Sequence, residues 1–102
     1  MRYILVLQWP GSSAADYDAL VEMEDLLESA LGDLASVDGH DFGSGEMNIF
    51  LETDRPVDAF SEVAAVLGNG PRWVDVRAAY RDATGERYEV LWPEALEQFS
   101  VK

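Results

Sequence analysis

Apolar side chains in the first third of the chain follow two different spacings, which predict a strand and then a helix. Residues 2–9 are apolar, β-branched or aromatic at almost every position, which is typical of a buried strand. Residues 14–31 repeat apolar side chains three and four positions apart, which predicts an amphipathic helix. Ser13 followed by Asp16 resembles a capping box at the start of this helix, and Gly32 suits its C-terminal end.

The middle of the chain predicts a hairpin and then a second helix. Residues 34–41 indicate a weaker strand and residues 46–53 a clearly alternating one, with a Gly-Ser-Gly turn between them. The second helix is predicted to begin within residues 54–56, where a proline suits the first turn, and to end at Gly68. Its predicted apolar stripe contains Val57, Phe60, Val63, Ala64 and Leu67.

The last third of the chain predicts two more strands and a tail. Residues 73–80 alternate in polarity and indicate a strand, which a turn over residues 82–85 separates from a final strand over residues 86–92. We expect the tail over residues 93–99 to form a short helix. Phe99 should then fold back on the core.

The predicted order is strand, helix, strand, strand, helix, strand, with one extra hairpin strand. This order is that of the ferredoxin-like plait, an α+β fold with both helices on one face of an antiparallel sheet. A chain of 102 residues has room for one core, so we expect a single domain over residues 1–102. Within residues 46–53, one face should carry Met47, Ile49 and Leu51 toward the helices, and the other should carry Glu46, Asn48, Phe50 and Glu52.

The sheet face without helices is predicted to be open and to mix aromatic with polar side chains. Exposed aromatic residues among polar groups are typical of a binding surface or of a homodimer interface. The alternative is a solvated sheet face with ordinary cross-strand pairs.

Charge changes this picture because it is large and unevenly distributed. The chain has 20 acidic and 7 basic residues, a formal charge of −13, and no cysteine. Residues 1–54 contain 12 acids and one base, whereas residues 55–102 contain eight acids and six bases. This balance argues against DNA, RNA or an anionic membrane as a direct partner. The lack of cysteine excludes disulfides and thiol chemistry.

Four residues of the first helix form a candidate partner surface, which we call the acidic row: Asp18, Glu22, Asp25 and Glu28. The like-charge pairs along this helix cost about 1–2 kcal/mol at low salt. One interpretation is a surface that attracts a basic protein partner, with association that weakens as salt rises. The alternative is that the charge only keeps the protein soluble.

The hairpin contains the candidate polar site, formed by His40, Glu46 and Asn48 with Asp75 and Arg77 from the strand over 73–80. Pairing of the hairpin strands predicts that His40 lies near Glu46 or Asn48. A histidine beside a carboxylate is the minimum for acid–base chemistry at neutral pH, and Arg77 would offer an anion contact. The alternative is a hydrogen-bonded surface histidine beside a turn rich in Gly and Asp.

These patterns favour a small acidic, non-catalytic protein-interaction domain. An inhibitor or immunity-type protein that binds a basic partner would fit the charge pattern. The alternative function is a small enzyme or small-molecule binder that uses His40 and Glu46 on the sheet face, sealed by dimerisation. No metal or cofactor motif is recognisable, and we expect neither group. With no signal peptide or membrane-spanning run in the sequence, we expect a cytoplasmic protein.

Overall fold

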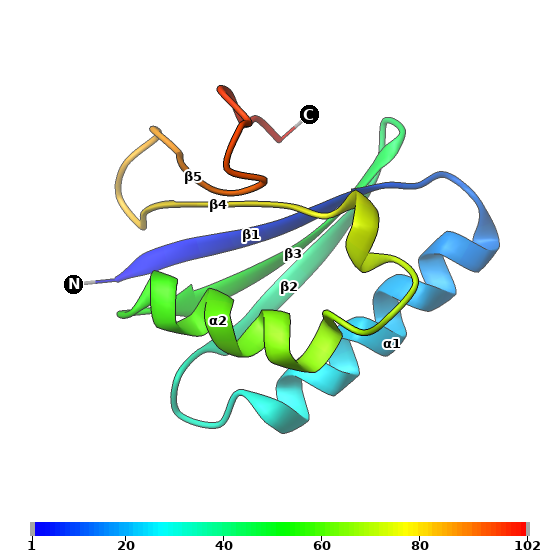
Figure 1. The fold of residues 1–102 in the computed structure, drawn as a ribbon, viewed down its shortest axis with the longest axis horizontal. Helices are drawn as coiled ribbons and strands as arrows, with labels where there is room; N and C mark the ends of the chain where they lie inside the picture. Colours follow the sequence, from blue (N-terminus) through cyan, green and yellow to red (C-terminus); the bar gives the residue numbers. More distant parts are fainter. Residues whose placement is uncertain (1, 102) are drawn as a thin grey trace.

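The computed structural model describes residues 2–101, in which two helices pack on one face of a five-stranded antiparallel sheet (Figure 1). The strands lie side by side in the order β2-β3-β1-β4-β5. This is the predicted α+β fold, a ferredoxin-like plait to which β5 adds a hairpin strand. The elements in chain order are β1 (Tyr3–Pro10), α1 (Ala14–Ala30), β2 (Ser36–Gly43), β3 (Glu46–Thr53), α2 (Pro56–Leu67), the 3₁₀ turn η1 (Trp73–Asp75), β4 (Arg77–Asp82) and β5 (Glu89–Trp92).

The helix-covered face of the sheet is apolar and forms the core. Leu7 of β1 lies opposite Ile49 of β3, which places both side chains on the same face. The predicted orientation of Met47, Ile49 and Leu51 toward the helices is confirmed, because all three are fully buried in the core. The helices add Leu20, Leu27, Ala59 and Val63 to the same core.

The ends of α1 follow the signals in the sequence. The Ser13 hydroxyl accepts a hydrogen bond from the Asp16 N–H, and the Asp16 carboxylate accepts one from the Ser13 N–H, both at 3.1 Å. This pair is the predicted capping box. Gly32, just after the helix, has φ of +54°, a left-handed conformation that glycine adopts without strain.

The predicted apolar stripe of α2 is confirmed at Val63 and Leu67 and is wrong at Val57. Pro56, Ala59, Val63 and Leu67 are the buried positions, whereas the side chain of Val57 is 56% exposed. The buried positions are three to four residues apart, so the core face of α2 runs through the small Ala59.

Neither helix within residues 2–101 is long and apolar enough to cross a membrane.

The hairpin strands keep the predicted order with small changes in their bounds. β2 begins and ends two residues later than predicted, and β5 begins at Glu89 rather than at position 86. The turn between β2 and β3 is confirmed. It places Ser44 and Gly45 at φ of +56° and +80°, the left-handed values of a two-residue hairpin turn.

The strand predicted over residues 73–80 is wrong in its first half. Trp73 begins the 3₁₀ turn η1, and β4 starts only at Arg77. The Trp73 ring stacks on Phe60 of α2 with ring centroids 5.8 Å apart, so this segment packs against a helix instead of extending the sheet. Val74, predicted to alternate within the strand, is 83% exposed.

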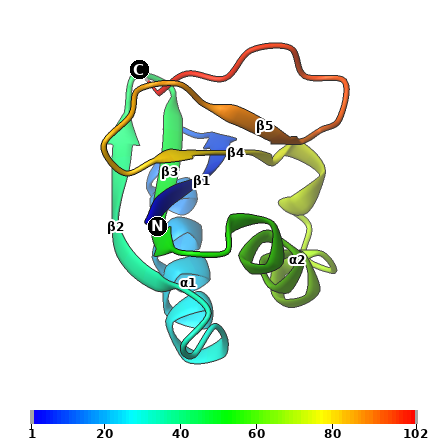
Figure 2. The same ribbon diagram turned by 90° about the vertical axis from the view of Figure 1, so that its left-hand side faces the viewer.

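The chain after β5 covers the sheet face that was predicted to be open. Figures 1 and 2 show this tail on the side of the sheet away from the helices. Residues 93–101 contain no helix, which corrects that expectation. Phe99 packs on Tyr88 with ring centroids 5.0 Å apart, and neither ring belongs to the core cluster on which Phe99 was expected to fold. Under the tail, Asn48 is fully buried and Glu46 nearly so, whereas Phe50 remains half-buried.

Candidate functional site

Three buried polar side chains form a hydrogen-bonded cluster on the tail-covered face, which we call the amide–carboxylate cluster: Gln8, Glu46 and Asn48. Gln8 of β1 lies opposite Asn48 of β3. The Gln8 amide nitrogen donates to Glu46 Oε2 at 3.1 Å and to Asn48 Oδ1 at 3.0 Å. The Asn48 amide nitrogen donates to the same Glu46 oxygen at 3.1 Å. Two amide groups therefore hold the Glu46 carboxylate in place.

The tail closes this cluster from above. The Gln8 amide nitrogen also donates to the backbone carbonyl of Ser100, at 2.9 Å. Its two hydrogens thus serve three acceptors, so at least one of these hydrogen bonds is shared. Since a buried polar group costs free energy unless it is hydrogen-bonded, the tail and the cluster stabilise each other.

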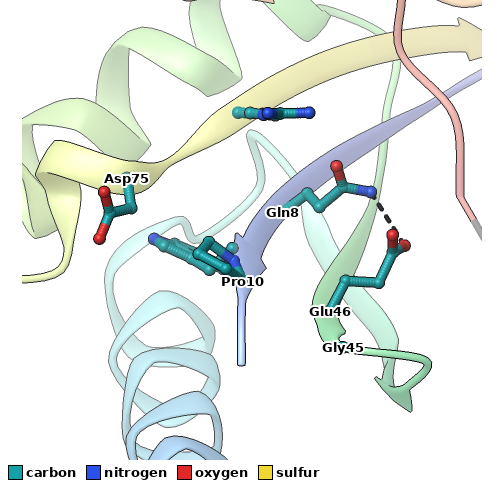
Figure 3. A pocket seen from close by; sticks show the side chains of 7 residues that line it. Gln8, Pro10, Gly45, Glu46 and Asp75 are labelled. Atoms are coloured by element: carbon teal, nitrogen blue, oxygen red, sulfur yellow. Dashed lines mark hydrogen bonds between the residues drawn. The ribbon is translucent and has the colours of Figure 1, made fainter. Parts of the chain in front are cut away.

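A cavity of about 280 Å³ adjoins the cluster at the end of β1. It exists because β4 pairs with β1 only as far as Arg77 opposite Gln8, and no described strand continues beside Trp9 and Pro10 on that side. A strand over residues 73–80, as predicted, would have filled this space. Figure 3 shows Asp75 and Glu46 on opposite sides of Pro10. The lining residues are Gln8, Trp9, Pro10, Gly45, Glu46, Asp75 and Arg77.

The structure brings together four of the five residues of the candidate polar site. Glu46, Asp75 and Arg77 line the cavity, and Asn48 is hydrogen-bonded to Glu46 behind it. His40 lies elsewhere. The predicted contact of His40 with Glu46 or Asn48 is wrong.

His40 is on the other face because of the register of β2. A register shift between Val37 and Gly39 places His40 opposite Ile49, so its side chain points to the helix-covered side. There its Nδ1 lies 3.1 Å from both carboxylate oxygens of Glu24 on α1. An ionised carboxylate can only accept, so the imidazole donates from Nδ1. The Tyr17 ring packs edge-on at 5.7 Å. Glu24 therefore orients the ring that Glu46 was expected to orient.

The sequence did not point to Gln8 and Trp9 as site residues. Gln8 is the one amide inside the apolar run of β1, and it is buried only because Asn48 and Glu46 face it. A single polar residue in an otherwise apolar strand is the signal that marks it.

Within residues 2–101, no three His, Asp or Glu side chains are arranged to hold a metal ion.

The acidic row (Asp18, Glu22, Asp25 and Glu28) lies on the solvent side of α1. All four side chains are exposed, and none has a hydrogen bond or ion pair with another residue of the described chain. Two other acids of α1 are engaged instead: Glu24 contacts His40, and Asp16 lies 2.8 Å from Arg72. The backbone N–H groups of Ser12 and Ser13, with Arg72, hold the pKa of Asp16 well below its usual range.

An apolar groove of about 320 Å³ runs beside the acidic row, between α1 and α2. Leu26 lies beside Glu22 and Asp25 on the surface of α1, at the edge of the groove, and is 54% exposed. The groove is lined mainly by Trp9, Met23, Leu26, Val66, Leu67 and Trp73, with Glu22 at its rim and Arg72 at one end.

No family model, curated protein or solved structure matches this chain, so its function is inferred from these two regions.

Proposed function

We propose that this protein is a protein-interaction domain that binds a basic partner through the acidic row and the apolar groove beside it. The observation that carries this proposal is their juxtaposition: unpaired carboxylates border an exposed apolar side chain, Leu26, along one edge of α1. An apolar centre with a charged rim is the usual anatomy of a protein-binding surface.

The charges of the groove favour a cationic partner. Glu22 and Asp25 lie next to Leu26 and have no counter-ion within the described chain. Arg72, the cation in the groove lining, is already held by Asp16. A partner with Lys or Arg around one apolar side chain would therefore relieve the repulsion along α1 and fill the groove.

The chemistry of this surface fits an amphipathic helix in the partner. Such a helix places an apolar side chain in a groove and its charged side chains at the rim. An inhibitor or immunity-type protein that neutralises a basic toxin or nuclease is the narrower form of this proposal, supported by the charge pattern. The competing explanation, that the charge serves solubility alone, requires no particular arrangement of the acids.

A charge-reversal experiment separates the two explanations. The probe is a synthetic helical peptide of Lys and Leu with Leu at every third and fourth position, and binding is followed by fluorescence polarisation. The triple variant Glu22→Lys, Asp25→Lys and Glu28→Lys should lose roughly tenfold or more in affinity. Binding to the unaltered protein should weaken strongly between low and physiological salt.

The control has the same change in net charge at a distance from the groove. Glu86, Glu94 and Glu97 are exposed and lie outside the groove lining, so their reversal to Lys should weaken binding much less. Equal losses in both triple variants would mean that net charge alone attracts the peptide, and the proposal would be wrong. Circular dichroism of each variant checks that the fold is retained.

A further inference from the structure

We propose that the cavity at the end of β1 binds a small zwitterion with the charges of a free α-amino acid. This site is separate from the acidic row, and the proposal does not depend on the function proposed for that row. The proposal rests on the polar groups that line the cavity and have no partner within the described chain.

Two side chains of opposite charge line the cavity without pairing. The guanidinium of Arg77 and the carboxylate of Asp75 have no hydrogen bond or ion pair with another described residue. Of the other described arginines, Arg87 also has no partner but lies outside the cavity, whereas Arg2 pairs with Glu52 at 3.0 Å and Arg81 donates to three backbone carbonyls. An unpaired guanidinium at a cavity is a ready contact for a carboxylate.

The third group is the indole of Trp9. This side chain is only 2% exposed and lines the cavity, and its Nε1–H has no acceptor among residues 2–101. The Nε1 atom itself is covered by protein atoms, so the Trp9 ring serves as a wall of the cavity whose indole N–H resonance senses a ligand bound beside it.

The fourth group is the amide oxygen of Gln8. The amide nitrogen is committed to Glu46, Asn48 and Ser100, which holds the amide in one orientation. Figure 3 shows the amide oxygen directed away from Glu46. Gln8 and Asp75 both line the cavity, so this oxygen and the Asp75 carboxylate are two acceptors that an ammonium group could meet there.

The charges around the cavity select the class of ligand. A simple anion would meet the carboxylates of Asp75 and Glu46, and a simple cation would meet Arg77. A zwitterion offers each group its complement. A cavity of about 280 Å³ is at the lower limit of pockets that hold drug-sized ligands, which suits a small metabolite.

The test is an NMR titration of the full chain labelled with ¹⁵N. The probes are glycine and L-serine as zwitterions, acetate as the carboxylate alone and ethylammonium as the amine alone. The readout is the indole N–H resonance of Trp9, assigned by its disappearance in Trp9→Phe. Both amino acids should shift this resonance saturably in the millimolar range expected of ligands this small. Acetate and ethylammonium should bind roughly tenfold more weakly or worse.

Variants at exposed positions test the two charges without disturbing the fold. Arg77→Gln and Asp75→Asn should each abolish the saturable shift, whereas Arg87→Gln, at an exposed arginine outside the cavity, should not. Arg77→Gln should leave binding of the Lys/Leu peptide unchanged, which separates this site from the acidic row. The proposal is overturned if neither amino acid shifts the Trp9 resonance, or if acetate alone shifts it as strongly.

Discussion

The two faces of the sheet are covered in different ways and are stabilised by different interactions. On the helix-covered face, Leu7, Met47 and Ile49 are fully buried among apolar side chains of both helices. On the tail-covered face, Asn48 is buried just as deeply and Gln8 nearly so, but they are amides whose hydrogen bonds are made to each other, to Glu46 and to the tail.

This difference shows that burial alone does not define a core. Buried apolar side chains stabilise the fold through buried area and packing, which have no preferred direction. The stability lost when such a side chain is truncated therefore scales with the volume removed. A buried polar cluster stabilises the fold only while every member is hydrogen-bonded. The stability lost in a variant therefore depends on which polar group is left without a partner. The two faces should therefore respond differently to truncation.

The largest effect is expected on the helix-covered face. Leu7→Ala leaves a cavity at the centre of the sheet and should lower the free energy of unfolding by about 2–5 kcal/mol. Urea unfolding followed by circular dichroism measures it. Leu26→Ala is the matched control, because the same truncation at a side chain that is 54% exposed should change stability by about 0.5 kcal/mol or less. Similar losses in the two variants would contradict the placement of the core.

A smaller and more specific effect is expected on the tail-covered face. Asn48→Ala removes one partner each from Gln8 and Glu46, and should cost about 1–3 kcal/mol. The informative measurement is a double-mutant cycle with Gln8→Ala. Because the two side chains are hydrogen-bonded, their effects should be non-additive by about 0.5–3 kcal/mol. Strict additivity would mean that the cluster does not act as a unit.

The helix-covered face was predictable from the sequence because its signals are local. The alternation in β3, the spacing of Leu20 and Leu27 in α1 and the capping residues at Ser13 each depend on neighbours a few positions away. These signals agree with the observed elements. The fold class followed from their order.

The tail-covered face and its cavity were not predictable because they depend on distant contacts. Nothing near Gln8 in the chain indicates that Ser100 will cover it. The alternation over residues 73–80 was overridden by stacking of Trp73 on α2, and that change opens the cavity. A register shift in β2 moved His40 away from Glu46, because a slip of one residue exchanges the two faces of a strand.

The smallest effect expected concerns a polar contact at the rim of the helix-covered side. Asp16 accepts hydrogen bonds from the Ser12 and Ser13 N–H groups and pairs with Arg72, which together hold its pKa well below the usual range. The unfolded chain therefore takes up a proton at Asp16 at a higher pH than the folded chain does. The stabilisation from Asp16 is then complete above the ordinary aspartate pKa of about 4 and is lost as the pH falls below it.

Asp16→Asn tests this sign. The variant should have a lower urea midpoint than the unaltered protein at about pH 7, and the gap should narrow as the pH falls below about 4. Asp18→Asn, at an exposed acid with no partner in the described chain, should show no such gap. A gap for Asp16→Asn that stays constant with pH would mean that its carboxylate is not held by the Ser12 and Ser13 N–H groups. In that case the side-chain capping of α1 would rest on the Ser13 hydroxyl, which accepts a hydrogen bond from the Asp16 N–H.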